Sequence, residues 1–147
     1  MHMACDVCFP AIISKILEHP DADVNRPSSS VGDNLYGLTI AMVACINDYP
    51  EVVDLLLERS DVEWNATDSS GNTALMYACI RGNETTFRQL FDLPMIDTAL
   101  TTPTGESALH MAALGGSVSI VTAFLDRGDF DYNKPWQVGS FSYRMNP

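Results

Sequence analysis

Two cysteines near the start of the chain have the spacing of a metal or redox site. Cys5 and Cys8 enclose two residues, as in motifs where two thiolates bind zinc or form a reactive disulfide. A structural zinc ion needs four ligands, and the sequence offers no second cysteine or histidine pair. It also holds no Ser-His-Asp set, phosphate loop or carboxylate pair at a spacing that fits catalysis. We therefore expect no enzymatic activity, no bound metal and no cofactor.

Four evenly spaced glycines indicate a repeated structural unit. The way these units stack must then position any functional surface. Gly37, Gly71, Gly105 and Gly139 follow one another at intervals of 34 residues. A fixed period of this length is typical of a solenoid, in which one small unit is stacked repeatedly. Turn-forming residues precede the glycines, as in the segment 68–71, where glycine can adopt a positive φ at little cost.

Each repeated segment carries the pattern of two short helices. Thr39, Thr73 and Ser107 can cap a first helix, and the small residues that follow would let neighbouring helices approach closely. A second apolar run places side chains three and four positions apart, on one helical face. These second runs are Glu51–Leu57, Thr85–Phe91 and Ser119–Leu125.

Aligned from their glycines, three segments share one nine-residue pattern. They read Gly-Leu-Thr-Ile-Ala-Met-Val-Ala-Cys at 37–45, Gly-Asn-Thr-Ala-Leu-Met-Tyr-Ala-Cys at 71–79 and Gly-Glu-Ser-Ala-Leu-His-Met-Ala-Ala at 105–113. This pattern resembles the ankyrin repeat, with its turn, its Thr-Pro-Leu-His-x-Ala-Ala signature and its second helix, although no segment keeps the signature proline. The resemblance implies an all-α ankyrin-repeat solenoid of stacked helix-turn-helix units with β-hairpin loops.

The repeat register predicts one ankyrin repeat domain over residues 3–147. Residues 1–2 are interpreted as an expression scar. The predicted parts are a partial N-terminal repeat with a loop insertion at 3–33, full repeats at 34–67, 68–101 and 102–135, and a partial C-terminal repeat at 136–147.

The same register gives the cysteines a structural interpretation. Cys5, Cys45 and Cys79 occupy one position of successive repeats, where the fourth repeat has Ala113. A buried packing residue fits this pattern, because free cysteine behaves as a small hydrophobe. Cys8 alone is expected on a turn between helices. We predict that the cysteines are reduced and metal-free.

Polar residues at signature positions are expected to support the repeats. The resemblance implies that His110 hydrogen-bonds backbone and ties neighbouring turns. Asn25, Asn65 and Asn133 stand where many ankyrin repeats carry an asparagine that stabilises the hairpin and is sometimes hydroxylated. Structure alone accounts for these residues, and modification of the asparagines stays open.

Composition narrows the classes of partner. The formal net charge of −11 at pH 7 argues against nucleic-acid binding, which needs a basic face. No apolar run is long enough for a transmembrane helix, and no basic segment followed by an apolar one opens the chain. We expect a cytoplasmic or nuclear protein whose partner is another protein or peptide, basic or apolar, without nucleic-acid binding or membrane insertion.

The function implied by the resemblance is that of a protein-protein interaction module within a larger protein. Stacked repeats of this kind offer a broad concave face and protruding hairpin tips. The alternative is a regulatory domain that acts in cis on an enzyme or channel in the full-length chain. A fold-level resemblance does not name the partner.

The binding residues carried over by register fall on the tips and on the first helices. The expected tip residues are Leu35, Tyr36, Leu38, Ser69, Ser70, Asn72, Thr104 and Glu106. The expected helix residues are Ile46, Asn47, Ile80, Arg81 and Leu114.

Two apolar groups stand out among these residues. Leu35, Tyr36 and Leu38 share one hairpin, whereas Ile46, Ile80 and Leu114 share one repeat position. If exposed, such groups mark contact sites. The alternatives are that the helix row buries between adjacent repeats, and that the tip cluster packs under the inserted loop near 28–30.

Overall fold

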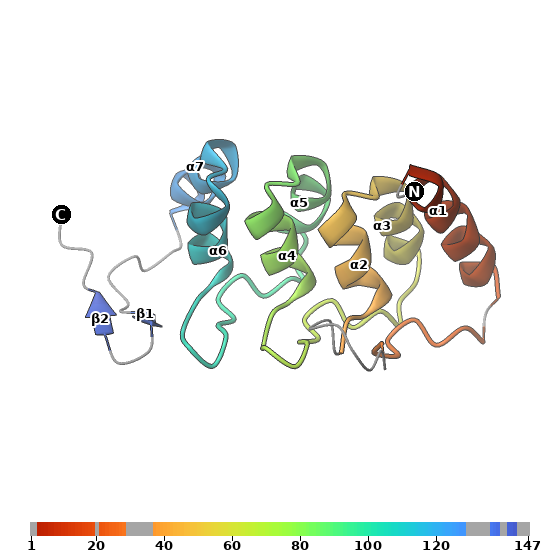
Figure 1. Ribbon diagram of the computed structural model, residues 1–147, viewed down its shortest axis with the longest axis horizontal. Coiled ribbons are helices and arrows are strands. Elements are labelled where there is room, and N and C mark those ends of the chain that lie inside the picture. Colours follow the sequence, from red (N-terminus) through yellow and green to blue (C-terminus); the bar gives the residue numbers. More distant parts are fainter. Residues whose placement is uncertain (1–2, 20, 29–36, 129–135, 139–140, 144–147) are drawn as a thin grey trace.

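The computed structural model describes residues 3–19, 21–28, 37–128, 136–138 and 141–143, with side chains for 10–19, 21–28 and 37–128. Helices follow one another along a single axis, and a short two-stranded sheet lies at the C-terminal end (Figure 1). The elements are α1 (Met3–Leu17), α2 (Ile40–Asn47), α3 (Pro50–Leu57), α4 (Ala74–Arg81), α5 (Glu84–Phe91), α6 (Ala108–Gly115), α7 (Val118–Arg127), β1 (Trp136–Val138) and β2 (Phe141–Tyr143).

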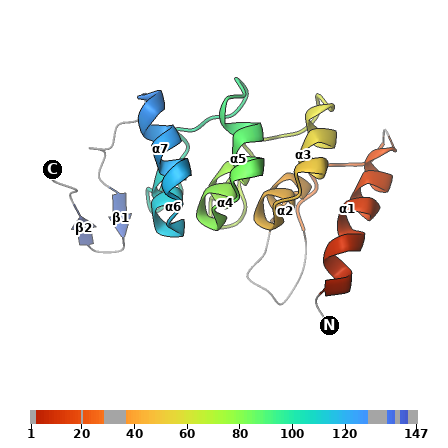
Figure 2. The same cartoon turned by 90° about the horizontal axis from the view of Figure 1, so that it is seen from above.

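The helices form two rows, which confirms the predicted stack of helix pairs. The first helices α2, α4 and α6 lie side by side, and the second helices α3, α5 and α7 form the other row (Figure 2). Helix α4 packs between α2 and α6, and α1 packs against α3. Strands β1 and β2 pair antiparallel, with Gln137 opposite Ser142. No helix among the described residues has the length and apolar character needed to cross a bilayer.

Local sequence explains where the first helices begin and end. Thr39 Oγ1 accepts from the Met42 amide at 3.4 Å and Thr73 Oγ1 accepts from the Met76 amide at 3.3 Å, so both threonines act as the predicted N-caps. Each first helix ends at a residue with left-handed backbone. These residues are Asp48, Gly82 and Gly116, with φ of 54°, 68° and 72°.

The periodic glycines close the hairpin turns. Gly37, Gly71 and Gly105 have φ of 84°, 82° and 92°, while Gly139 lies outside the described residues. The Gly71 amide donates to Asp68 O at 3.0 Å, and the same bond joins Gly105 to Thr102 at 2.9 Å. The last residue of each turn has a positive φ, and glycine suits this position.

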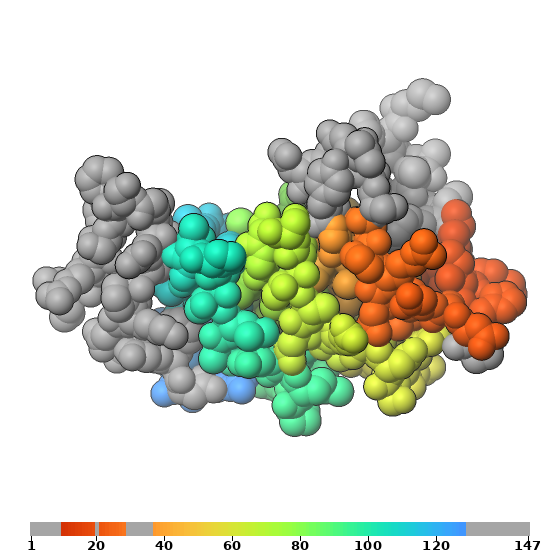
Figure 3. Space-filling model, turned by 90° about the horizontal axis from the view of Figure 1, so that it is seen from below, coloured from red at the N-terminus to blue at the C-terminus, as the bar shows by residue number. Residues whose placement is uncertain are grey.

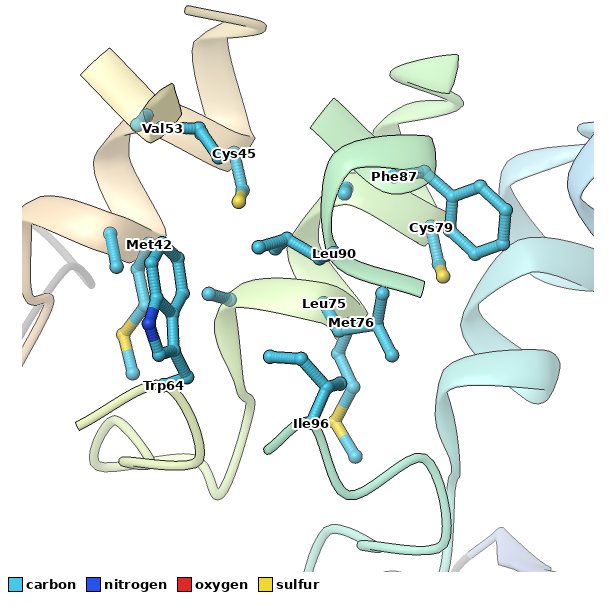
Figure 4. Close-up of a cluster of buried hydrophobic side chains, with 14 of the residues drawn as sticks. Met42, Cys45, Val53, Trp64, Leu75, Met76, Cys79, Phe87, Leu90 and Ile96 are labelled. Atoms are coloured by element: carbon cyan, nitrogen blue, oxygen red, sulfur yellow. The ribbon is translucent and has the colours of Figure 1, made fainter. Parts of the chain in front are cut away.

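The core runs continuously between the helix pairs. Figure 4 shows Met42, Trp64, Leu90 and other buried side chains from successive repeats. Beyond them, Phe87, Phe91 and Phe124 form an aromatic cluster whose ring centroids lie 4.7–5.7 Å apart. Because each interface lies between neighbouring repeats, adjacent units stabilise one another.

Cys45 and Cys79 occupy the packing position predicted for them. Both thiols are free, and both residues are 0% exposed (Figure 4). Burial raises the pKa of Cys45 to about 12 and also raises the pKa of Cys79. The side chains of Cys5 and Cys8 lie outside the described residues.

The expected turn at Cys8 is wrong. The backbone of residue 8 lies inside α1, which continues to Leu17 with Pro10 in its interior. In later repeats the equivalent turn uses Asp48, Gly82 or Gly116, all with positive φ. Cysteine rarely adopts that conformation, so the helix continues where the other repeats turn.

Candidate functional site

The inner face, defined here as the exposed residues of α2, α4 and α6, contains two predicted apolar residues. Ile80 and Leu114 are 39% and 59% exposed. Ile46, at the same repeat position, is half-buried and packs against the core. Burial between repeats therefore applies to Ile46, whereas Ile80 and Leu114 remain on the surface. Asn47 and Arg81 are exposed beside this row.

The central hairpin tip is held by Asp68, which was not among the predicted site residues. The Asp68 carboxylate accepts from the Ser70 and Asn72 amides at 2.9 and 2.8 Å, and from the Tyr77 hydroxyl. Burial, together with this bond to Asp68, raises the pKa of Tyr77 to about 12. Ser69 and Ser70 are exposed and Asn72 is half-buried, so the tip presents small polar groups on a fixed backbone.

The following tip is organised around Glu106. Its carboxylate accepts from the hydroxyls of Thr102 and Thr104. Desolvation alone would raise the pKa of Glu106, but these hydrogen bonds outweigh it and lower the pKa. Thr104 is exposed and Glu106 half-buried. The sequence signal for such a residue is an aspartate or glutamate close to serine or threonine residues in a hairpin tip.

Leu38 was expected to be an exposed tip residue, and this expectation is wrong. Its side chain is 6% exposed and belongs to the core. The Ser28 amide donates to Leu38 O at 2.9 Å, and the Leu38 amide donates to Ser28 Oγ at 3.2 Å. Leu38 thus packs beside the segment that precedes the insertion. Leu35 and Tyr36, predicted on the same tip, lie outside the described residues.

Two asparagines expected to stabilise hairpins instead bond to the next repeat. Asn25 donates to Asp61 O at 2.6 Å and accepts from the Glu63 amide at 2.8 Å. Asn65 makes the equivalent pair of bonds to the loop after α5. Each side chain therefore ties its own repeat to the next. Asn133 lies outside the described residues.

His110 makes the predicted hydrogen bond to backbone. The Ser107 amide donates to His110 Nδ1 at 3.0 Å, which places the bond within the first turn of α6. Burial lowers the pKa of His110, against the opposing effect of Glu106. These contacts give His110 a structural role at the start of the helix.

The negative charge of the chain lies mainly away from the inner face. Arg81 is the one Asp, Glu, Lys or Arg residue in α2, α4 and α6, all three of which are fully described. The exposed acidic residues of the second helices and of the loops after them include Glu51, Asp54, Glu58, Asp61, Glu63, Glu84, Asp92 and Asp97. The two sides therefore differ in the chemistry that they offer to a partner.

The described residues give no sign of a metal centre. No group of three or more His, Cys, Asp or Glu side chains gathers within them at a spacing that could hold an ion. The contacts of His110, Asp68 and Glu106 are those of caps and turns. The candidate site is accordingly a surface.

The chain matches family models over most of its length. A model of "Ankyrin repeats (3 copies)" matches residues 1–98, and a model of a single "Ankyrin repeat" matches residues 104–134. One similar protein carries this family's name. The photoreceptor ankyrin repeat protein of Homo sapiens is 32% identical over 85 residues, which cover 56% of this chain and 19% of that protein.

Inversins are similar over a comparable stretch. Inversin of Danio rerio is 35% identical over 81 residues, covering 54% of this chain and 8% of that protein. Inversin of Gallus gallus is 39% identical over 62 residues, covering 42% and 6% respectively. The matched stretch thus spans 19% or less of each of these relatives.

Proposed function

Because the chain belongs to the ankyrin repeat family, we propose that it is a binding module that holds a partner protein or peptide on its inner face and hairpin tips. Ankyrin repeats are generally protein-protein interaction modules. The proposed footprint consists of Leu35, Tyr36, Ile46, Asn47, Ser69, Ser70, Asn72, Ile80, Arg81, Thr104, Glu106 and Leu114. Leu38 is left out because it is buried.

The observation that carries this proposal is the exposed row around Arg81. Ile80 and Leu114 occupy the same position of consecutive repeats and remain 39% and 59% exposed. Exposed apolar groups rimmed by polar residues mark contact surfaces, and arginine is enriched at the centre of interfaces. Helix α4 also lies between α2 and α6, so a partner centred on Arg81 would gain contacts on both sides.

The charge distribution favours an apolar partner for this face. The three inner helices carry Arg81 and no carboxylate, so they offer little to a strongly basic segment. An apolar ligand with a neutral or acidic group opposite Arg81 would complement them.

We further propose that the module has no catalytic activity of its own and works inside the cell, in the cytoplasm or nucleus. In the cis-regulatory alternative the same face would bind another part of the full-length chain. Adding that part as a separate polypeptide distinguishes the two, since a cis ligand would then compete with the external partner.

A pull-down with paired variants tests the proposal. Tagged wild-type protein is compared with the double variant Ile80→Ser/Leu114→Ser, and with Glu58→Ala as the control on the second-helix side. Captured proteins are identified by mass spectrometry. The partner should be retained by wild type and Glu58→Ala and lost by the double variant. Retention by the double variant with loss by Glu58→Ala would place the site elsewhere.

A further inference from the structure

The loops after α3 and α5 form a groove that the inner face does not include. The groove has a volume of about 520 Å³ and is lined by residues of the segment 59–66 together with Met95. These loops lie beyond α3 and α5, away from α2, α4 and α6 (Figure 2). In Figure 3 they project side by side at the lower edge, in yellow and green.

The two sides of the groove are fixed to each other by Asn65. Its amide nitrogen donates to Met95 O at 2.8 Å, and its Oδ1 accepts from the Asp97 amide at 2.9 Å. Two hydrogen bonds from one side chain thus hold both loops in register. A ligand would therefore meet a surface that is already formed, which lowers the ordering cost of binding.

One end of the groove is apolar. Met95 is 50% exposed, Val62 is half-buried, and the Trp64 ring lies beneath the loop with 6% exposure. One repeat earlier, the position of Met95 is held by Asp61, which forms a salt bridge with Arg59 at 2.7 Å. Of the two loop pairs that an asparagine bridges in the described residues, this one alone offers an exposed methionine.

Acidic residues lie in and beside the groove and form its rim. Glu63 lines the groove, Asp61 lies between the lining residues Ser60 and Val62 in the sequence, and the Asp97 amide bonds to the lining residue Asn65. All three acidic residues are exposed. Arg59 lines the groove, but its guanidinium binds the Asp61 carboxylate at 2.9 and 2.7 Å and also donates to Ala22 O. Within the described part of the chain, no salt bridge joins a cation to Glu63 or Asp97. The groove is therefore negatively charged next to its apolar end.

We propose that this groove is a second docking site, which binds a short basic segment of a partner protein. One apolar side chain of the segment sits against Met95 and Val62, and flanking Lys or Arg side chains face Glu63 and Asp97. Charge complementarity selects this occupant, because an acidic segment would be repelled by the same rim. The groove is separate from the inner face, so binding at one of the two sites does not depend on binding at the other.

Fluorescence polarisation with a defined peptide tests this site. The probe is fluorescein-labelled Gly-Arg-Lys-Arg-Leu-Arg-Lys-Arg-Gly, and its twin carries Ser in place of Leu. Wild type should prefer the leucine peptide. Glu63→Lys should weaken binding by about tenfold, as expected for reversing a charge opposite a basic ligand. Met95→Ser should remove the preference for leucine while leaving binding of the twin within about twofold.

The control variant matches the change in charge at a distant position. Glu51→Lys alters the exposed first turn of α3, at the end of that helix remote from the groove, and should change affinity by no more than about twofold. Equal weakening by Glu51→Lys and Glu63→Lys would show attraction to net charge alone and overturn the proposal. So would an unchanged leucine preference in Met95→Ser, or no binding of the peptide to wild type. Thermal melts confirm that each variant is folded.

Discussion

A Cβ atom placed on Gly71 would lie 2.5 Å from Cδ of Pro103 in the next hairpin. The glycine period therefore reflects two requirements at once. The turn needs a positive φ, which is 82° at Gly71, and the neighbouring tip needs the space that a side chain would fill. A side chain at position 71 would therefore force the neighbouring tips to shift, and the spacing of the tips sets the shape of the proposed binding surface.

Gly71→Val should be strongly destabilising. Backbone strain at such a position costs on the order of 1–3 kcal/mol, and the contact with Pro103 adds to it. Urea unfolding followed by circular dichroism measures the loss. Gly116→Ala is the control for backbone strain, because Gly116 has φ of 72° and a Cβ added there would have no other atom within 4 Å. Equal stability of Gly71→Val and wild type would show that neither the positive φ nor the space before Pro103 requires glycine at this position.

Asn65→Ala should loosen the link between two repeats. The variant removes both hydrogen bonds to the loop at Met95 and Asp97, at a cost of about 1 kcal/mol for an exposed side chain. The Asp97 amide should also exchange with deuterium faster, since its acceptor is gone. Ser70→Ala, on the exposed tip of the same hairpin, serves as the control. Unchanged exchange at Asp97 would mean that the loop is held by other contacts.

Glu106 should make stability depend on acidic pH. Its folded pKa lies below the ordinary value of 4.5, so its contribution is full above that value and is lost as pH falls through the lower, folded pKa. The difference in melting temperature between wild type and Glu106→Gln should therefore be largest near neutral pH and shrink below pH 4.5. A difference that stays constant down to about pH 3 would contradict the role given to the Thr102 and Thr104 hydroxyls.

Cys45 and Cys79 should resist alkylation in the native protein. Only the thiolate reacts, and burial raises the pKa of both thiols. Iodoacetamide treatment at about pH 8, followed by peptide mapping, should modify them in urea but hardly at all without it. Native labelling as fast as in urea, or a Cys45–Cys79 disulfide in a freshly reduced sample, would contradict the packing role.

The helix pairs could be predicted because their signals are local and repeated. Thr39 and Thr73 cap helices by contacts within one turn, and Gly71 meets the conformational demand of its own turn. A position that recurs in every repeat, such as that of Cys45 and Cys79, also reveals burial. Repetition therefore carries packing information that a single segment would not.

The surface was harder to predict, because exposure depends on what the rest of the chain places nearby. Leu38 bonds to Ser28 as Asn72 bonds to Asp68 in the next repeat, yet Leu38 is buried whereas Asn72 is half-buried. Cys8 lies in a helix because the first repeat has no residue suited to positive φ at the turn. The groove beside Met95 arises between loops of two repeats, so no single segment predicts it.

The binding energy of an identified partner tests the central claim most directly. Isothermal titration calorimetry would compare Arg81→Ala and Tyr36→Ala with Glu58→Ala, each checked for folding. Central aromatic and arginine residues typically lose about 2 kcal/mol or more on truncation, whereas ordinary surface changes stay within about 0.5 kcal/mol. The account predicts a loss of about 2 kcal/mol or more for Arg81→Ala and for Tyr36→Ala, and a change within about 0.5 kcal/mol for Glu58→Ala. Abolished binding in Glu58→Ala, with full affinity in Arg81→Ala, would contradict it.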